Sequence, residues 1–107
     1  MLFRSRQSLS AGVDAYLRGQ YEETIRLLSV EFADRTAAAE AALFRAAARD
    51  ALYRIGGATN ESLRREIESD LSAYRELRPN GRPDPRIFSP RFIEIVTAPT
   101  PPGRAPR

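Results

Sequence analysis

The side chains that carry most enzyme chemistry are scarce in this chain. Its 107 residues include no cysteine and no histidine, which excludes Ser-His and Cys-His nucleophile pairs and any histidine or thiolate metal site. Carboxylates and tyrosines remain as acid–base candidates. Glu66 and Asp70 are spaced to share one helix face, as an acid pair or half of a metal site requires. The plainer interpretation, which we prefer, is a solvated helix face.

Two further groups also have a structural interpretation that we prefer to a chemical one. Asp50 lies among alanines, and we expect it to pair with Arg54 or Arg49 on a helix face rather than to act as a buried acid. Residues 56–60 read GGATN and open a helix. A phosphate cradle needs a preceding strand and a following lysine, and neither is present. We therefore expect no catalytic residue, no metal site and no cofactor.

Arginine supplies all of the positive charge, and most of its excess lies near the C-terminus. The 17 basic residues are all arginine, which reflects either a GC-rich genome or selection for the bidentate guanidinium fork. Residues 1–77 have 11 Arg against 12 acids, a net charge of −1, whereas residues 78–107 have 6 against 2, a net charge of +4. The basic character therefore belongs to the tail of the chain.

The basic tail offers a candidate nucleic-acid surface, because phosphates attract arginine and bases stack on aromatic rings. The arginines concerned are Arg78, Arg82, Arg86 and Arg91. Phe88 lies between Arg86 and Arg91 in the sequence, and Phe92 follows Arg91. We expect both phenylalanines to face the core of the domain instead, so docking of the tail is preferred to nucleic-acid binding.

Four segments with apolar residues at three- and four-residue spacing predict amphipathic helices. They are residues 8–18, 21–32, 36–55 and 61–77. Gly19 and the pair Gly56-Gly57 mark helix ends. The third segment is rich in alanine, which has the highest helix propensity and lets other helices approach closely. We expect it to be a central helix that is contacted on more than one side.

The character of the chain changes after Arg78, where prolines predict an extended path. Ser89-Pro90 then restarts a helix, with serine as the N-cap and proline as the first helical residue, and we expect this helix to run to about Val96. A short edge strand over residues 93–97 is the alternative. The residues expected to dock the tail on the domain are Phe88, Phe92, Ile93 and Val96. Residues 1–97 would form one domain that includes the closing segment 79–97, followed by a flexible terminus at 98–107.

Residues 12–28 read GVDAYLRGQYEETIRLL, and this stretch resembles a tetratricopeptide repeat. Gly12 matches the glycine at which the two helices of the repeat meet, Gly19 the turn glycine and Tyr21 the aromatic residue after it. Thr24 occupies a small-residue position and Leu28 a large apolar position of the second helix.

The remainder of the chain departs from the repeat. Ser8, Glu31 and Thr36 replace a tryptophan-like residue, an alanine and a closing proline. A second unit over residues 47–79 is longer than a regular repeat. Residues 82–92, RPDPRIFSPRF, look like a closing element that follows such hairpins in some bacterial proteins, many of them exported. The resemblance implies an all-α fold of two antiparallel helical hairpins with right-handed stacking; a plain four-helix bundle is the alternative.

The resemblance also implies a groove lined by the first helix of each hairpin. On this chain the lining residues would be Arg6, Leu9, Val13, Tyr16 and Leu17. The family's clamp for a terminal carboxylate needs lysine and asparagine at two positions that Leu9 and Val13 occupy here, so that clamp is not expected. An apolar ligand surface, ordinary core packing and coverage by the tail of the chain all remain open.

The function expected from these observations is that of a non-enzymatic protein-interaction or scaffold domain. The alternative is a structural subunit that self-assembles into a homo-oligomer or filament through open repeat flanks and the tail, and a lesser one is weak nucleic-acid binding. Neither a small-molecule substrate nor a membrane span is expected. The compartment stays open between the cytoplasm and export after loss of a leader.

Overall fold

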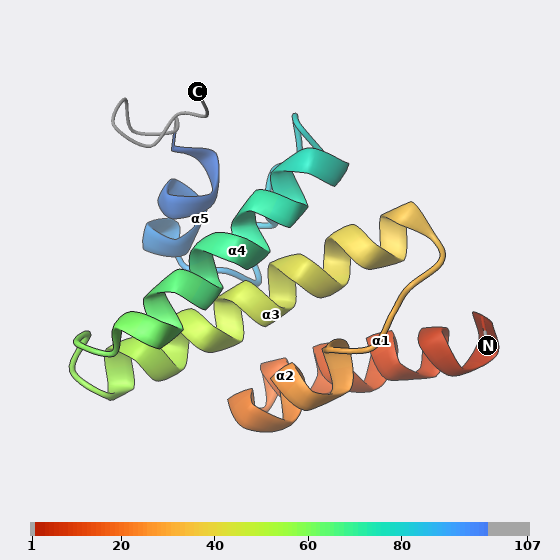
Figure 1. The fold of residues 1–107 in the computed structure, drawn as a ribbon, viewed down its shortest axis with the longest axis horizontal. Coiled ribbons are helices and arrows are strands. Elements are labelled where there is room, and N and C mark those ends of the chain that lie inside the picture. Colours follow the sequence, from red (N-terminus) through yellow and green to blue (C-terminus); the bar gives the residue numbers. More distant parts are fainter. Residues whose placement is uncertain (1, 99–107) are drawn as a thin grey trace.

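The computed structural model describes the backbone of residues 2–98 and the side chains of residues 7–98, and within this part the chain forms five helices and no strand (Figure 1). The helices are α1 (Leu2–Leu17), α2 (Tyr21–Leu28), α3 (Arg35–Ile55), α4 (Glu61–Leu77) and α5 (Pro90–Thr97). The predicted all-α fold is confirmed. Beyond Ala98, the terminus predicted to be flexible lies outside the described residues.

The first four helices follow one another as antiparallel neighbours (Figure 1). Helix α1 packs on α2, both pack on α3, and α3 packs along α4. Helix α3 occupies the central position that was expected for the alanine-rich segment. Its alanines are buried, with Ala39, Ala46 and Ala48 fully inaccessible to solvent. Small side chains on several faces of one helix allow three neighbours to approach its backbone.

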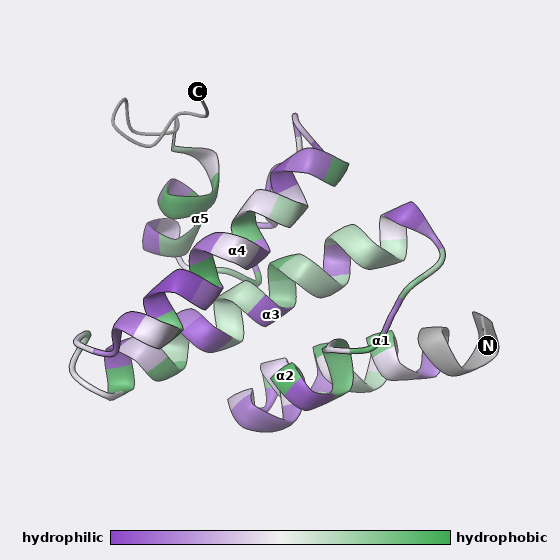
Figure 2. Cartoon of the chain, in the orientation of Figure 1, coloured by the Kyte–Doolittle hydropathy of each residue, from purple (hydrophilic) through white to green (hydrophobic). Residues whose placement is uncertain are grey.

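Helices α3 and α4 differ in the hydropathy of their residues (Figure 2). Much of α3 is weakly hydrophobic, whereas α4 alternates strongly hydrophilic and hydrophobic residues along its length. That alternation is the amphipathic pattern of a helix that buries one stripe and exposes the other. The buried residues of α4 are Ile67, Asp70, Leu71 and Tyr74.

Helix α2 ends four residues earlier than predicted, at Leu28 rather than Phe32. Three hydrogen bonds satisfy carbonyl groups of its last turns without further helix. The Ser29 hydroxyl donates to the Ile25 carbonyl at 2.5 Å, the Ser29 N–H to Arg26 at 3.5 Å, and the guanidinium of Arg45 on α3 to the Leu28 carbonyl at 2.7 Å. Because the last contact comes from another helix, the periodicity of the segment could not show where α2 stops.

Helices α3, α4 and α5 begin within one residue of the predicted boundaries, and each start has a side-chain cap. The carboxylate of Asp34 accepts a hydrogen bond from the Ala37 N–H at 2.8 Å, and the side chain of Asn60 accepts one from Leu63 at 3.1 Å. Ser89 caps α5 in the same way, with proline following it. Residues 93–97 are therefore helical, and the alternative of an edge strand there is wrong. Helix α1 begins earlier than predicted, at Leu2 rather than Ser8.

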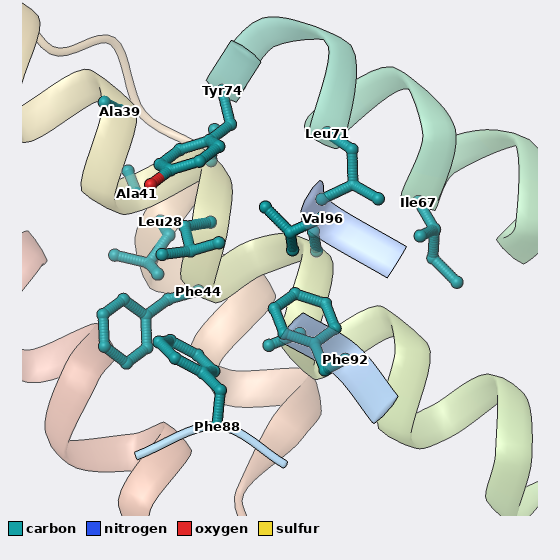
Figure 3. Packing of buried hydrophobic residues seen from close by; sticks show 14 residues of the cluster. Leu28, Ala39, Ala41, Phe44, Ile67, Leu71, Tyr74, Phe88, Phe92 and Val96 are labelled. Atoms are coloured by element: carbon teal, nitrogen blue, oxygen red, sulfur yellow. The ribbon is translucent and has the colours of Figure 1, made fainter. Parts of the chain in front are cut away.

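The buried core cluster joins α2, α3 and α4 to the closing segment (Figure 3), and half-buried residues of α1 pack against it. Leu28 of α2, Phe44 of α3 and Leu71 of α4 are at most 4% exposed, and Phe88, Phe92 and Val96 of the closing segment are each 3% exposed. Residues 88–96 thus contribute large side chains to the same cluster as the hairpins. Burying a phenylalanine stabilises the fold by about 1.5–3 kcal/mol relative to leaving it exposed.

Candidate functional site

The residues predicted to line a groove on α1 are divided between the core and the surface. Leu9 and Val13 are half-buried and pack against the hydrophobic core. Leu17 is 61% exposed. The side chain of Arg6 lies outside the described residues. Tyr16 is half-buried, and its ring contacts Phe88 of the closing segment.

Aromatic rings from three parts of the chain meet at Tyr16. Its ring lies 5.4 Å from that of Phe44 on α3, in an edge-to-face arrangement, and 5.7 Å from that of Phe88 in the closing segment. Phe88 in turn lies 5.0 Å from Phe44 and 5.4 Å from Phe92. Pairs at these separations contribute about 0.5–1.5 kcal/mol each beyond the area they bury. The closing segment therefore occupies the face between α1 and α3 that an open groove would leave free.

A cavity remains beside the docked segment, and we call it the Tyr16 cavity. Its volume is about 490 Å³, which is within the range of about 300–1,000 Å³ typical of ligand sites. Two alanines of α3, Ala47 and Ala51, leave the space open. The other residues that line it are Tyr16, Asp50, Arg54, Ile87, Ser89, Arg91 and Phe92. The cavity thus combines an apolar wall with several polar groups.

The polar side of the Tyr16 cavity contains an ion pair. Asp50 is 8% exposed and accepts a hydrogen bond from the guanidinium of Arg54 at 3.1 Å. It is therefore both a buried acid and the partner of Arg54, two roles that the sequence interpretation treated as alternatives. Burial raises the pKa of the Tyr16 phenol, and electrostatic interactions with Tyr21 and with the Asp50 carboxylate raise it further.

The four arginines considered for nucleic-acid binding do not form one surface with exposed rings. Phe88 and Phe92 are each 3% exposed, so neither ring is available for stacking on a base. Arg86 pairs with Asp84 at 3.2 Å. Arg91 lines the Tyr16 cavity, whereas Arg78 and Arg82 line a separate cavity at the end of α4.

A buried ion network was missed by the sequence interpretation. Asp70, expected on a solvated face of α4, has a side chain only 7% exposed and accepts hydrogen bonds from Arg45 at 3.0 Å and Arg49 at 2.5 Å. Glu66 is 54% exposed and lies 3.7 Å from Arg49, as a solvated residue would. The four-residue spacing of Arg45 and Arg49 does predict that they share one face of α3. That spacing does not predict that this face packs against Asp70 of α4. The network links α2, α3 and α4, because Arg45 also donates to the Leu28 carbonyl at the end of α2.

Across the described part of the chain, no three side chains of His, Cys, Asp or Glu are grouped so that they could hold a metal ion. No helix in that part is long and apolar enough to cross a bilayer. Searches of protein-family models, curated proteins and solved structures find no match to this sequence or its fold. The function must therefore be argued from the surfaces and cavities of the chain itself.

Proposed function

We propose that this chain is a non-enzymatic protein-interaction or scaffold domain of the tetratricopeptide-like kind. The observation that carries the proposal is the Tyr16 cavity, which opens on the face between α1 and α3 and combines an apolar wall with a polar rim. Convergent polar groups around an apolar space are typical of sites that bind a ligand selectively. The sequence contains no histidine and no cysteine, and the described residues include no group of three carboxylates that could hold a metal ion.

The packing of the first hairpin supports the tetratricopeptide-like part of the proposal. Gly12 of α1 is in such close contact with Leu28 of α2 that a Cβ at this position would overlap the leucine side chain. A glycine at the crossing of the two helices is what the resemblance implies for the repeat. The order of contacts, in which α3 packs on both helices of the first hairpin and then on α4, is also compatible with two stacked hairpins.

A partner would bind beside the closing segment rather than in its place. Phe88, Phe92 and Val96 are core residues at 3% exposure, and displacing three such side chains would cost about 4.5–9 kcal/mol of burial. This is comparable to the whole stability of a domain of this size, roughly 5–15 kcal/mol. The residues left for a partner are those at the rim, where Ile87 is 38% exposed and Arg91 is also exposed.

Selection of peptides from a random display library against the immobilised full chain tests this function. We expect enriched peptides to bind with micromolar affinity, and Ile87→Ser to weaken them about tenfold because an apolar contact at the rim is lost. Val30→Ser is the matched control, since Val30 is 42% exposed and lies outside the Tyr16 cavity.

Three results are decisive in this experiment. Enriched peptides that respond to Ile87→Ser and not to Val30→Ser support the proposal. Equal effects of the two substitutions would show that the cavity is not the binding site. A library that yields no binder after several rounds would count against an interaction domain altogether.

Self-assembly is the second candidate, and exposed apolar side chains favour it. Leu17 is 61% exposed and Ile55 is 73% exposed. Ile55 and Leu52 border a hollow of about 700 Å³ next to the turn between α1 and α2. Sedimentation velocity over a wide concentration range tests this candidate. Dimers or larger species that Ile55→Ser dissociates would support self-assembly, whereas a monomer at the highest concentration would reject it.

A further inference from the structure

A second cavity, which we call the arginine cavity, lies where α4 and α5 both end. It has a volume of about 410 Å³ and is bordered by the last turn of α4, the turn at residues 78–82 and the end of α5. Three guanidinium groups line it, those of Arg75, Arg78 and Arg82, and no aspartate or glutamate does. This concentration of one sign of charge around a concave surface is unlike the mixed charges elsewhere on α4.

The three arginines differ in how far their hydrogen-bonding capacity is used. Arg75 donates to the carbonyls of Ile95 and Val96 at 2.8 and 3.1 Å, which suits the negative end of the α5 dipole. Arg78 approaches Glu40 at only 3.6 Å, too far for a strong hydrogen bond. Arg82 is exposed and has no acidic partner within the described residues. Since a guanidinium carries five N–H donors, most donors at this cavity are available to a ligand.

The wall that holds these arginines is tightly packed. The Gly81 N–H donates to the Arg78 carbonyl at 3.0 Å, and the Arg78 N–H donates to the Tyr74 carbonyl at 2.8 Å. Gly81 lies so close to Tyr74 that a Cβ there would overlap the phenol group. Tyr74 itself is 2% exposed. The turn therefore rests on a buried side chain, which pre-organises the cavity and lowers the entropic cost of binding.

We propose that the arginine cavity binds carboxylate side chains of an acidic peptide segment on a protein partner. The inference rests on the proposed interaction function and specifies the chemistry of the partner. Arginine's planar fork matches a carboxylate with two parallel hydrogen bonds. The three arginines at the cavity, with no aspartate or glutamate among its lining residues, would also steer an acidic partner towards it.

An acidic peptide fits this cavity better than a nucleic acid. Single-stranded nucleic acids are held by a charged groove together with aromatic rings on which bases stack. The aromatic residue at the arginine cavity is Tyr74, which is buried, and Phe88 and Phe92 are buried as well. What the cavity offers is a compact set of charged donors without a stacking surface.

Fluorescence anisotropy of a labelled glutamate–alanine peptide, titrated with the full chain at low salt, tests the proposal. We expect this peptide to bind and the matched glutamine–alanine peptide not to bind. The affinity should fall as sodium chloride is added, because dissolved ions screen the attraction between the arginines and the carboxylates. Arg82→Glu should reduce the affinity about tenfold. Arg65→Glu is the matched control, since Arg65 is an exposed arginine of α4 that does not line the cavity.

Each outcome supports or overturns the assignment. Loss of affinity with Arg82→Glu and not with Arg65→Glu supports it. Equal losses would indicate attraction by net charge alone, and a single-stranded oligonucleotide that displaces the peptide at lower concentration would assign the cavity to nucleic acid; both overturn the proposal. If the acidic peptide does not bind while the library selection still yields other peptides, the carboxylate site is rejected and the interaction function stands.

Discussion

Replacing the buried Asp70 by alanine should destabilise the fold far more than replacing Glu66, its exposed neighbour on α4. The carboxylate is 7% exposed at its side chain and accepts from two guanidinium groups, those of Arg45 and Arg49, which are themselves only 20% and 17% exposed. Without it, two largely buried cations face each other with no anion between them. Removing one partner of such a buried pair costs about 3–5 kcal/mol.

The lower end of that range, about 3 kcal/mol, applies here. Arg45 keeps its hydrogen bond to the Leu28 carbonyl, and Arg49 keeps a weak contact with Glu66 at 3.7 Å. Each kilocalorie shifts the midpoint of thermal unfolding by about 4–8 °C in a domain near this size. We therefore expect Asp70→Ala to lower the midpoint by roughly 12–24 °C.

Urea denaturation followed by far-ultraviolet circular dichroism measures the loss directly. Glu66→Ala is the matched control, because Glu66 lies one turn earlier on the same helix, is 54% exposed and also faces Arg49. This substitution should lower the free energy of unfolding by less than about 0.5 kcal/mol. A triple variant with Arg45→Met, Arg49→Met and Asp70→Leu should recover most of the stability, since apolar side chains remove the desolvation cost. If Asp70→Ala and Glu66→Ala cost the same, the network has no special role and the reasoning is refuted.

Three further predictions concern the closing segment, the first hairpin and alkaline pH. Phe88→Ala should cost about 3–5 kcal/mol in thermal unfolding, against less than about 1 kcal/mol for Ile87→Ala, and equal losses would mean that the segment is not docked in solution. Gly12→Ala should destabilise the chain although alanine favours helix by about 1 kcal/mol, because the new methyl group overlaps Leu28; the additional change Leu28→Ala should relieve part of the loss, and additive losses would contradict the overlap. The raised pKa of Tyr16 means that this phenol binds its proton more tightly when folded, so its contribution to stability is complete below the unfolded pKa near 10 and is lost as pH rises through the folded pKa. Tyr16→Phe should flatten this alkaline decline in urea-denaturation series, and an unchanged slope would show that Tyr16 is not responsible.

Prediction from the sequence succeeded where the signals were local. Helices α3, α4 and α5 begin within one residue of the predicted boundaries, and α4 ends at Leu77 as predicted. Each of these starts depends on a side chain that accepts a hydrogen bond from a backbone N–H of its own helix, three residues further on. The predicted length of α2 was wrong because its end depends on a contact that is not local. Arg45 of α3 donates a hydrogen bond to the carbonyl of Leu28, the last residue of α2.

The residues of the candidate sites also differ in whether their contacts could be predicted from local sequence spacing. Asp50 and Arg54 are one helical turn apart, and their pairing could be expected from that spacing. The burial of Asp70 could not be predicted from the sequence. An acid on α4 can face either water or two arginines of α3, and the rotation of the two helices against each other decides which. The Tyr16 cavity likewise needs α1, α3 and the segment after Arg86 to be brought together.

By themselves, the residues of this chain determined that it is helical, where most of its helices begin, and that histidine, cysteine and lysine chemistry is absent. These properties follow from composition and from interactions within a few residues. The tertiary structure decided which face of each helix is buried, that Phe88 lies on Tyr16 and Phe44, and that three arginines meet in one cavity. Such contacts join residues distant in sequence, and their free energy depends on packing and desolvation, which have no counterpart in a local pattern.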